Sequence, residues 1–63
     1  MIINGETYEY ADMTLQRLIN KLALNSEAIV AEVNGEIIPR INFDSYIVDK
    51  EAAVELVAFV GGG

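Results

Sequence analysis

The chain has 63 residues, 52% of them hydrophobic, and ten acidic against four basic side chains give a formal net charge of −6. This length predicts one small domain, at residues 1–60, followed by a flexible glycine tail at 61–63. The chain has neither cysteine nor histidine, which excludes disulfides, zinc fingers, iron–sulfur ligands and catalytic thiolates or imidazoles.

The charge and the hydropathy pattern exclude two classes of partner. Nucleic-acid backbones and anionic membranes repel an acidic protein, so a basic partner surface is its natural complement. No apolar run approaches the roughly 18 residues that cross a bilayer, and no signal peptide opens the chain. We therefore expect no nucleic-acid or membrane partner, and a cytoplasmic location.

The first half of the chain predicts a hairpin and then a helix. Strands at residues 1–4 and 7–10 are joined through Asn4-Gly5, which supports the positive-φ turn of a tight hairpin. Thr14 is a good helix N-cap. Asn25 is predicted to take the left-handed conformation that ends the helix. Apolar residues at i, i+3, i+4 and i+7 form one stripe, at Leu15, Leu18, Ile19 and Leu22.

The second half predicts another hairpin and a long final strand. Residues 28–33 and 36–38 flank a second Asn-Gly, and Pro39 ends the return strand because proline cannot donate to a ladder. Residues 40–45 are predicted to form an irregular connection or one tight turn, and 46–48 a brief edge strand. The last strand, from Ala52 or Ala53 to Val60, is apolar on nearly every residue, which suits a central position.

Two hairpins and one helix have to share one core. The simplest packing lays the helix across one face of a mixed sheet. With the final strand beside the first, we expect an α+β fold of the β-grasp (ubiquitin-like) class, with four to five strands in the sheet. The other face then has no helix to cover it.

Alternation along the last strand places Glu55, Val57 and Phe59 together on one face of the sheet. The charge of Glu55 indicates that this face meets solvent. Val57 and Phe59 are then either scattered surface hydrophobics or a docking patch for a partner, just ahead of the tail.

The tail consists of Gly61, Gly62 and Gly63. Glycine has no Cβ, so such a tail is thin and mobile, and it can carry its carboxylate through a narrow channel into the active site of another protein. A frayed chain end is the alternative interpretation. The tail alone does not decide between the two.

The body of the chain shows no catalytic or metal-binding pattern. Its acidic residues fall in turns or on polar faces, and none of them forms a recognisable acid/base pair, calcium loop or phosphate-binding motif. We expect no catalytic residue, no metal site and no bound cofactor. Arg40, in the turn after Pro39, is either a surface charge that satisfies a backbone carbonyl or a contact to an acidic site on a partner.

Three stretches resemble the thiamin-biosynthesis sulfur carriers (the ThiS family), small β-grasp proteins that end in Gly-Gly. They are Thr14-Leu15 with Leu18, Val33–Arg40 followed by Phe43, and Phe59–Gly63. Together they span the whole chain. Two departures stand out: the family commonly has Leu-Gly where this chain has Leu24-Asn25, and a Gly-Asp turn where residues 49–53 lie.

The resemblance implies a carrier, not an enzyme. An E1-like adenylating enzyme would use MgATP to activate the carboxylate of Gly63, and sulfur from a cysteine desulfurase or sulfurtransferase would replace AMP. The resulting thiocarboxylate would donate sulfur to thiazole synthase, with Gly61 and Gly62 as the tether. The candidate docking residues are Val57, Phe59 and Arg40. Alternatives are the small subunit of molybdopterin synthase, another ubiquitin-like sulfur carrier or protein tag, and a non-covalent interaction module.

Overall fold

The computed structural model describes residues 1–59. Val60 and the glycines at 61–63 lie outside the described residues, so the predicted division between domain and tail stays a prediction.

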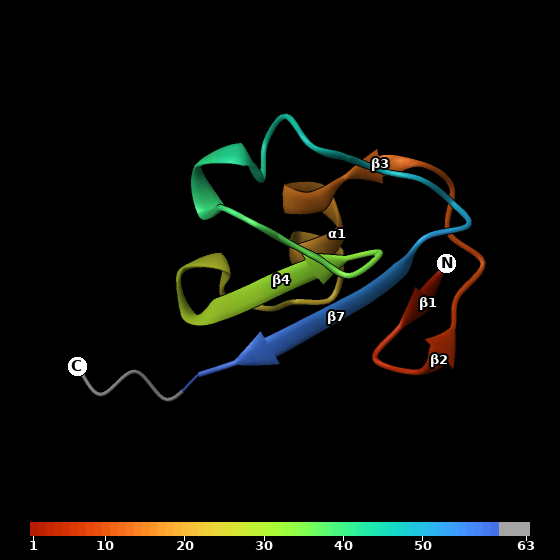
Figure 1. Cartoon of the computed structure of the whole chain (residues 1–63), viewed down its shortest axis with the longest axis horizontal. Helices are drawn as coiled ribbons and strands as arrows, with labels where there is room; N and C mark the ends of the chain where they lie inside the picture. The colour runs from red at the N-terminus through yellow and green to blue at the C-terminus, as the bar shows by residue number, and fades with distance from the viewer. Residues whose placement is uncertain (60–63) are drawn as a thin grey trace.

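Five strands form one mixed sheet in the order β2-β1-β7-β4-β5. β1 (Ile2–Ile3) pairs antiparallel with β2 (Glu6–Thr7) and parallel with β7 (Ala53–Ala58). β4 (Ile29–Val33) pairs antiparallel with β7 and with β5 (Glu36–Ile38). Figure 1 shows β4 and β7 side by side through the middle of the molecule. The predicted central place of the final strand is confirmed.

Both hairpins turn at Asn-Gly, and the backbone shows why. The φ angles are 51° and 84° at Asn4 and Gly5, and 52° and 85° at Asn34 and Gly35. Two successive positive φ angles are what a type I′ turn requires. The Asn4 amide also accepts from the N–H of Leu56 at 2.9 Å and donates to its carbonyl at 3.2 Å. It thus continues the pairing of β1 with β7 past the end of β1.

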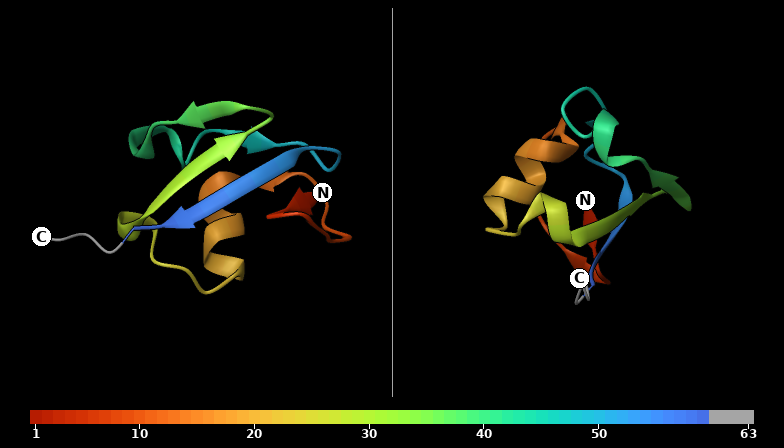
Figure 2. Two further views of the ribbon diagram at one scale, coloured as in Figure 1. Left: turned by 60° about the horizontal axis from the view of Figure 1, so that its bottom comes forward. Right: turned by 90° about the vertical axis from the view of Figure 1, so that its left-hand side faces the viewer.

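The helix α1 (Leu15–Lys21) begins where the sequence predicts. The hydroxyl oxygen of Thr14 accepts from the N–H of Arg17 at 3.1 Å, which satisfies a donor that the first helical turn leaves free. Leu15, Leu18 and Ile19 are fully buried. Figure 2 shows α1 lying across one face of the sheet, so one helix over a five-stranded mixed sheet makes the β-grasp fold, as predicted.

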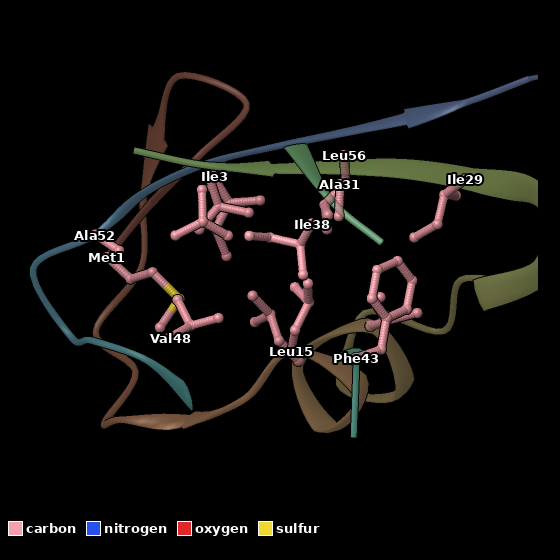
Figure 3. Close-up of a cluster of buried hydrophobic side chains, with 14 residues drawn as sticks. Met1, Ile3, Leu15, Ile29, Ala31, Ile38, Phe43, Val48, Ala52 and Leu56 are labelled. Carbon is pink, nitrogen blue, oxygen red and sulfur yellow. The ribbon is translucent and has the colours of Figure 1, made fainter. Parts of the chain in front are cut away.

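The core fills the space between α1 and that face. Figure 3 shows Ile3 and Leu56 from the sheet pointing toward Leu15 of the helix, with Val48 toward one side of the cluster and Phe43 toward the other. All five side chains are buried. Within residues 1–59 no polar or charged side chain is buried, so the core of the described part of the chain is wholly apolar.

The predicted end of the helix is wrong. The left-handed residue is Ala23, with φ 60°, and the N–H of Leu24 bonds to the carbonyl of Ile19 at 3.1 Å, as in a Schellman motif. Asn25 has φ −91°, and its side chain accepts from the N–H of Glu27 at 3.0 Å. The apolar stripe is complete before Ala23, so a longer helix would bury nothing further.

The brief strand predicted at residues 46–48 exists but is not an edge of the main sheet. β6 (Ile47–Val48) pairs antiparallel with β3 (Met13–Thr14) in a separate two-stranded sheet. Val48 is fully buried, which holds β6 beside the start of the helix. The tight turn predicted after Pro39 is the short 3₁₀ helix η2 (Arg40–Asn42).

Candidate functional site

The C-terminal end of β7 lies against a short 3₁₀ helix, η1 (Ser26–Ala28). The N–H of Phe59 donates to the carbonyl of Ala28 at 3.0 Å, so the pairing of β7 with the β4 segment continues through Phe59. Figure 1 places this end of β7 on the side of the molecule away from the N-terminus. Phe59 is therefore held at one end of the domain, directly before the segment that contains the predicted tail.

Arg40 reaches the same short helix from the other direction. Its Nη1 donates to the carbonyl oxygen of Glu27 at 3.3 Å, and Glu27 lies in η1 beside Ala28. The interpretation that Arg40 satisfies a backbone carbonyl is thus confirmed. The structure brings Arg40 and Phe59 to one end of the domain, and a contact of Arg40 with a partner stays a prediction.

The face of the sheet that α1 does not cover carries a group of exposed apolar side chains. Val57 is directly across from Val30, and the two are 58% and 42% exposed. Ile37 on β5 is 65% exposed and Phe59 is 46% exposed. We call this surface the open face, and define it by Val30, Glu32, Ile37, Glu55, Val57 and Phe59. The predicted exposure of Val57 and Phe59 is confirmed.

Two glutamates interrupt the apolar part of the open face. Glu32 of β4 is directly across from Glu55 of β7, and Ile37 is directly across from Glu32 on the other side. Glu32 is half-buried and Glu55 is exposed. Alternation along the last strand predicts Glu55 on this face. The places of Glu32, Val30 and Ile37 were not predicted, because they depend on how β4 pairs with β7 and β5.

The charges of the chain are divided between the sheet and the rest of the fold. The five strands contain four glutamates and no lysine or arginine. The basic residues lie in α1, in η2 and in the turn before β7, and they are Arg17, Lys21, Arg40 and Lys50. Two of these glutamates, Glu32 and Glu55, lie on the open face, and a basic partner surface is its electrostatic complement.

The remaining predicted site residues, Gly61, Gly62 and Gly63, lie outside the described residues. In the described range 1–59, no three histidine, cysteine or acidic side chains are grouped so that they could hold a metal ion. No helix in that range has the length and apolar character to span a membrane. Two shallow hollows lie away from Phe59, one beside Tyr8 and Tyr10 and one beside Arg17.

Comparisons with known proteins agree with this fold over the whole chain. The model of the ThiS family matches residues 1–63. The crystal structure of the thiamine biosynthesis protein (ThiS) from Geobacter metallireducens superposes with a TM-score of 0.81 at 32% identity, covering 98% of this chain and 96% of that one. An uncharacterized protein, ycf40, of Porphyra purpurea is 39% identical over 62 residues, which is 97% of this chain and 87% of its own length.

A longer relative matches as well. The thiazole synthase of Paramagnetospirillum magneticum is 36% identical over 64 residues. The match covers 100% of this chain but 20% of that enzyme, so the chain spans about a fifth of the length of this relative. Because the family model matches from the first residue to the last, the chain belongs to the ThiS family.

Proposed function

We propose that this chain carries sulfur for the thiazole ring of thiamin and that the C-terminal carboxylate of Gly63 is its reacting group. The observation that carries this role is the ThiS family match over residues 1–63. The likeness to a thiamine biosynthesis protein over nearly its full length gives further support.

The first step of the proposed cycle activates the carboxylate. A carboxylate resists substitution because its oxygens leave poorly, so an E1-like partner enzyme joins it to AMP. An oxygen of Gly63 attacks the α-phosphorus of MgATP and pyrophosphate departs. A sulfide equivalent from a cysteine desulfurase or sulfurtransferase then attacks the activated carbonyl carbon. AMP leaves with the electrons of the broken C–O bond, and the product is a thiocarboxylate.

The composition of the chain fits this division of labour. The reacting group is the backbone terminus, so a carrier needs no cysteine or histidine, and this chain has neither. The domain acts as a recognition handle and as a co-substrate of its partner enzymes, without a bound cofactor of its own. Gly61 and Gly62 form the tether that reaches the partner active site, and the cycle takes place in the cytoplasm.

The open face is the proposed docking surface for the activating enzyme. Val57 and Phe59 present apolar area directly ahead of the tail, so contact there would bring the chain end toward the partner active site. Arg40 lies at the same end, against η1, where its remaining N–H groups are available to an acidic group of the partner.

The proposed acceptor of the sulfur is thiazole synthase. The thiazole synthase of Paramagnetospirillum magneticum has a segment 36% identical to this chain. In that organism a segment similar to this chain is part of the enzyme itself. This supports a physical partnership between the separate carrier and thiazole synthase. We therefore place this chain before thiazole synthase in the sulfur transfer.

The intact mass of the chain tests the proposal. After incubation with the activating enzyme of the same organism, MgATP and a sulfur donor, exchange of one carboxylate oxygen for sulfur raises the mass by about 16 Da. A synthetic chain with an amide at Gly63 is the matched control, because it keeps the fold but has no carboxylate. The role would be disproved if the mass of the chain did not change although the activating enzyme was active, which release of AMP with a known carrier would show.

A further inference from the structure

We propose that Arg40 is a positioning residue of the carrier, because through the short helix η1 it keeps Phe59 paired in the sheet. It thereby sets the point at which the chain that leads to Gly63 leaves the domain. This inference rests on the proposed function and adds to it a residue that acts in the free carrier, before any partner is bound.

The last residue pair between β7 and the β4 segment is incomplete. Continuing the register of β4 with β7 by one residue pairs Ala28 with Phe59, and a hydrogen-bonded pair in an antiparallel ladder ordinarily exchanges two N–H···O bonds. The N–H of Phe59 donates to the carbonyl of Ala28 at 3.0 Å, but the N–H of Ala28 donates to the carbonyl of Asn25 at 2.9 Å. Within residues 1–59, Phe59 is therefore paired through one bond, and that bond depends on where η1 holds Ala28.

The short helix η1 depends on bonds to its surroundings, because a single 3₁₀ turn has weak internal hydrogen bonds. The side chain of Asn25 accepts from the N–H of Glu27 at 3.0 Å, and this contact is local. The guanidinium of Arg40 donates from Nη1 to the Glu27 carbonyl at 3.3 Å and reaches back across 13 residues from η2. Arg40 thus anchors the peptide group that joins Glu27 to Ala28, whose own carbonyl holds Phe59.

Two features of Arg40 suit this role. Pro39 precedes it with φ −60° and ψ 143°, and the proline ring limits backbone motion at the base of the arginine. A charged donor forms a stronger hydrogen bond than a neutral one, and a guanidinium N–H is such a donor. Neither feature requires burial, so an arginine that is exposed is able to hold η1.

Loss of the Arg40 bond is expected to open the end of β7 and to leave the core unchanged. Pairs at the end of a ladder open with free energies near zero, and one exposed hydrogen bond changes such an equilibrium about two- to tenfold. In the paired form the backbone of Phe59 is already ordered. In the open form it has to be ordered when the partner binds, so the affinity falls.

Two chemical changes, made singly and together, test whether Arg40 acts through Phe59. Arg40→Met removes the donor and keeps an unbranched side chain. A synthetic carrier with an ester in place of the Ala58–Phe59 amide lacks the N–H of Phe59 and keeps every side chain. Arg17→Met is the matched control, because it makes the same change of charge in the first turn of α1, at the opposite end of that helix from the loop that leads to η1.

The measurements are amide exchange in the free carrier and adenylation by the activating enzyme of the same organism. We expect Arg40→Met to raise the exchange rate of the Phe59 amide and KM by about two- to fivefold each, since the open form then predominates. Because the ordering cost is incurred on binding, kcat should change less than about twofold. The ester carrier should show a similar rise in KM, and the combined carrier should be no worse than the ester carrier. Arg17→Met should match the unsubstituted chain in both measurements.

Losses that multiply in the combined carrier would overturn the inference, because Arg40 would then act independently of Phe59, as a direct contact with the partner does. An unchanged exchange rate of the Phe59 amide in the Arg40→Met variant would overturn it as well, as would an equal rise in KM for Arg17→Met. The mass test of the proposed function does not depend on these rates. If the Arg40→Met variant gains sulfur with an unchanged KM, the chain retains its proposed function and this inference fails.

Discussion

Replacement of Val57 by threonine tests whether the open face docks the activating enzyme. Threonine has nearly the shape of valine and suits a strand equally well, but it puts a hydroxyl in place of a methyl group. Val57 is 58% exposed, so the change removes little from the folded core. The free energy of unfolding should stay within about 0.5 kcal/mol of the original value.

The expected loss of docking energy follows from the exposed fraction. Full burial of a valine side chain contributes about 1.5–3 kcal/mol. With 58% of Val57 still exposed in the free chain, a partner that covers it gains about 0.9–1.7 kcal/mol. A hydroxyl buried there without a partner removes most of this gain. Docking should therefore weaken about 5- to 20-fold.

Steady-state adenylation by the activating enzyme is the assay, with the carrier concentration varied. We expect KM for the Val57→Thr carrier to rise by the factor above while kcat changes less than about twofold, because docking energy is present in both ground and transition states. Ile47→Thr is the matched control, since Ile47 is also 58% exposed but lies in β6, outside the main sheet. An unchanged KM for Val57→Thr, or an equal rise in the control, would refute the docking assignment.

Two further predictions concern the helix end and the tail. Ala23→Gly should raise the free energy of unfolding in urea by a net of about 0.5–1 kcal/mol. The left-handed cost of about 1–2 kcal/mol disappears, and the greater unfolded-state entropy of glycine offsets about 0.4–1 kcal/mol of this gain. Asn25→Gly should give no increase in the free energy of unfolding. An increase for Asn25→Gly together with none for Ala23→Gly would place the helix end at Asn25 instead. Gly62→Val should leave the urea midpoint unchanged and abolish adenylation, because a branched side chain thickens the tether. Adenylation at the original rate would contradict threading through a narrow channel.

The elements that the sequence predicts correctly are those that local chemistry determines. Asn-Gly requires two positive φ angles, and both hairpins turn there. Thr14 caps the helix through a bond only three residues long. The nearly continuous apolar run before the tail indicates a strand with neighbours on both sides, and β7 has β1 and β4. In each case a few adjacent residues are enough to predict the element.

The helix end was mispredicted because residue preference and packing disagree there. Asparagine accepts the left-handed conformation more easily than alanine, so Asn25 is the residue that local rules select. In the structure Ala23 takes that conformation, and the side chain of Asn25 caps η1. An earlier helix end brings η1 to the end of β7, where Ala28 bonds to Phe59. A long-range contact has prevailed over a local preference.

Only half of the open face could be read from the sequence. Alternation along one strand is a local property, and it places Val57 and Phe59 together with Glu55. Whether Glu32 lies beside Glu55 depends on the register between β4 and β7, which are about twenty residues apart in the chain. A shift of one residue would move every side chain of β4 to the other face. The glutamate pair therefore emerges only from the paired sheet.

The position of that pair also bears on why an exposed apolar patch is tolerable in this chain. A flat apolar sheet face invites a second copy to pack on it. Two copies packed through their open faces would bring four carboxylates, two from each chain, into a poorly hydrated interface, and such like-charge contacts cost several kcal/mol. The same carboxylates attract a basic partner. In the proposed cycle the carrier leaves one enzyme before it meets the next, so a face that disfavours packing of two copies and offers partners a modest apolar area would suit reversible transfer.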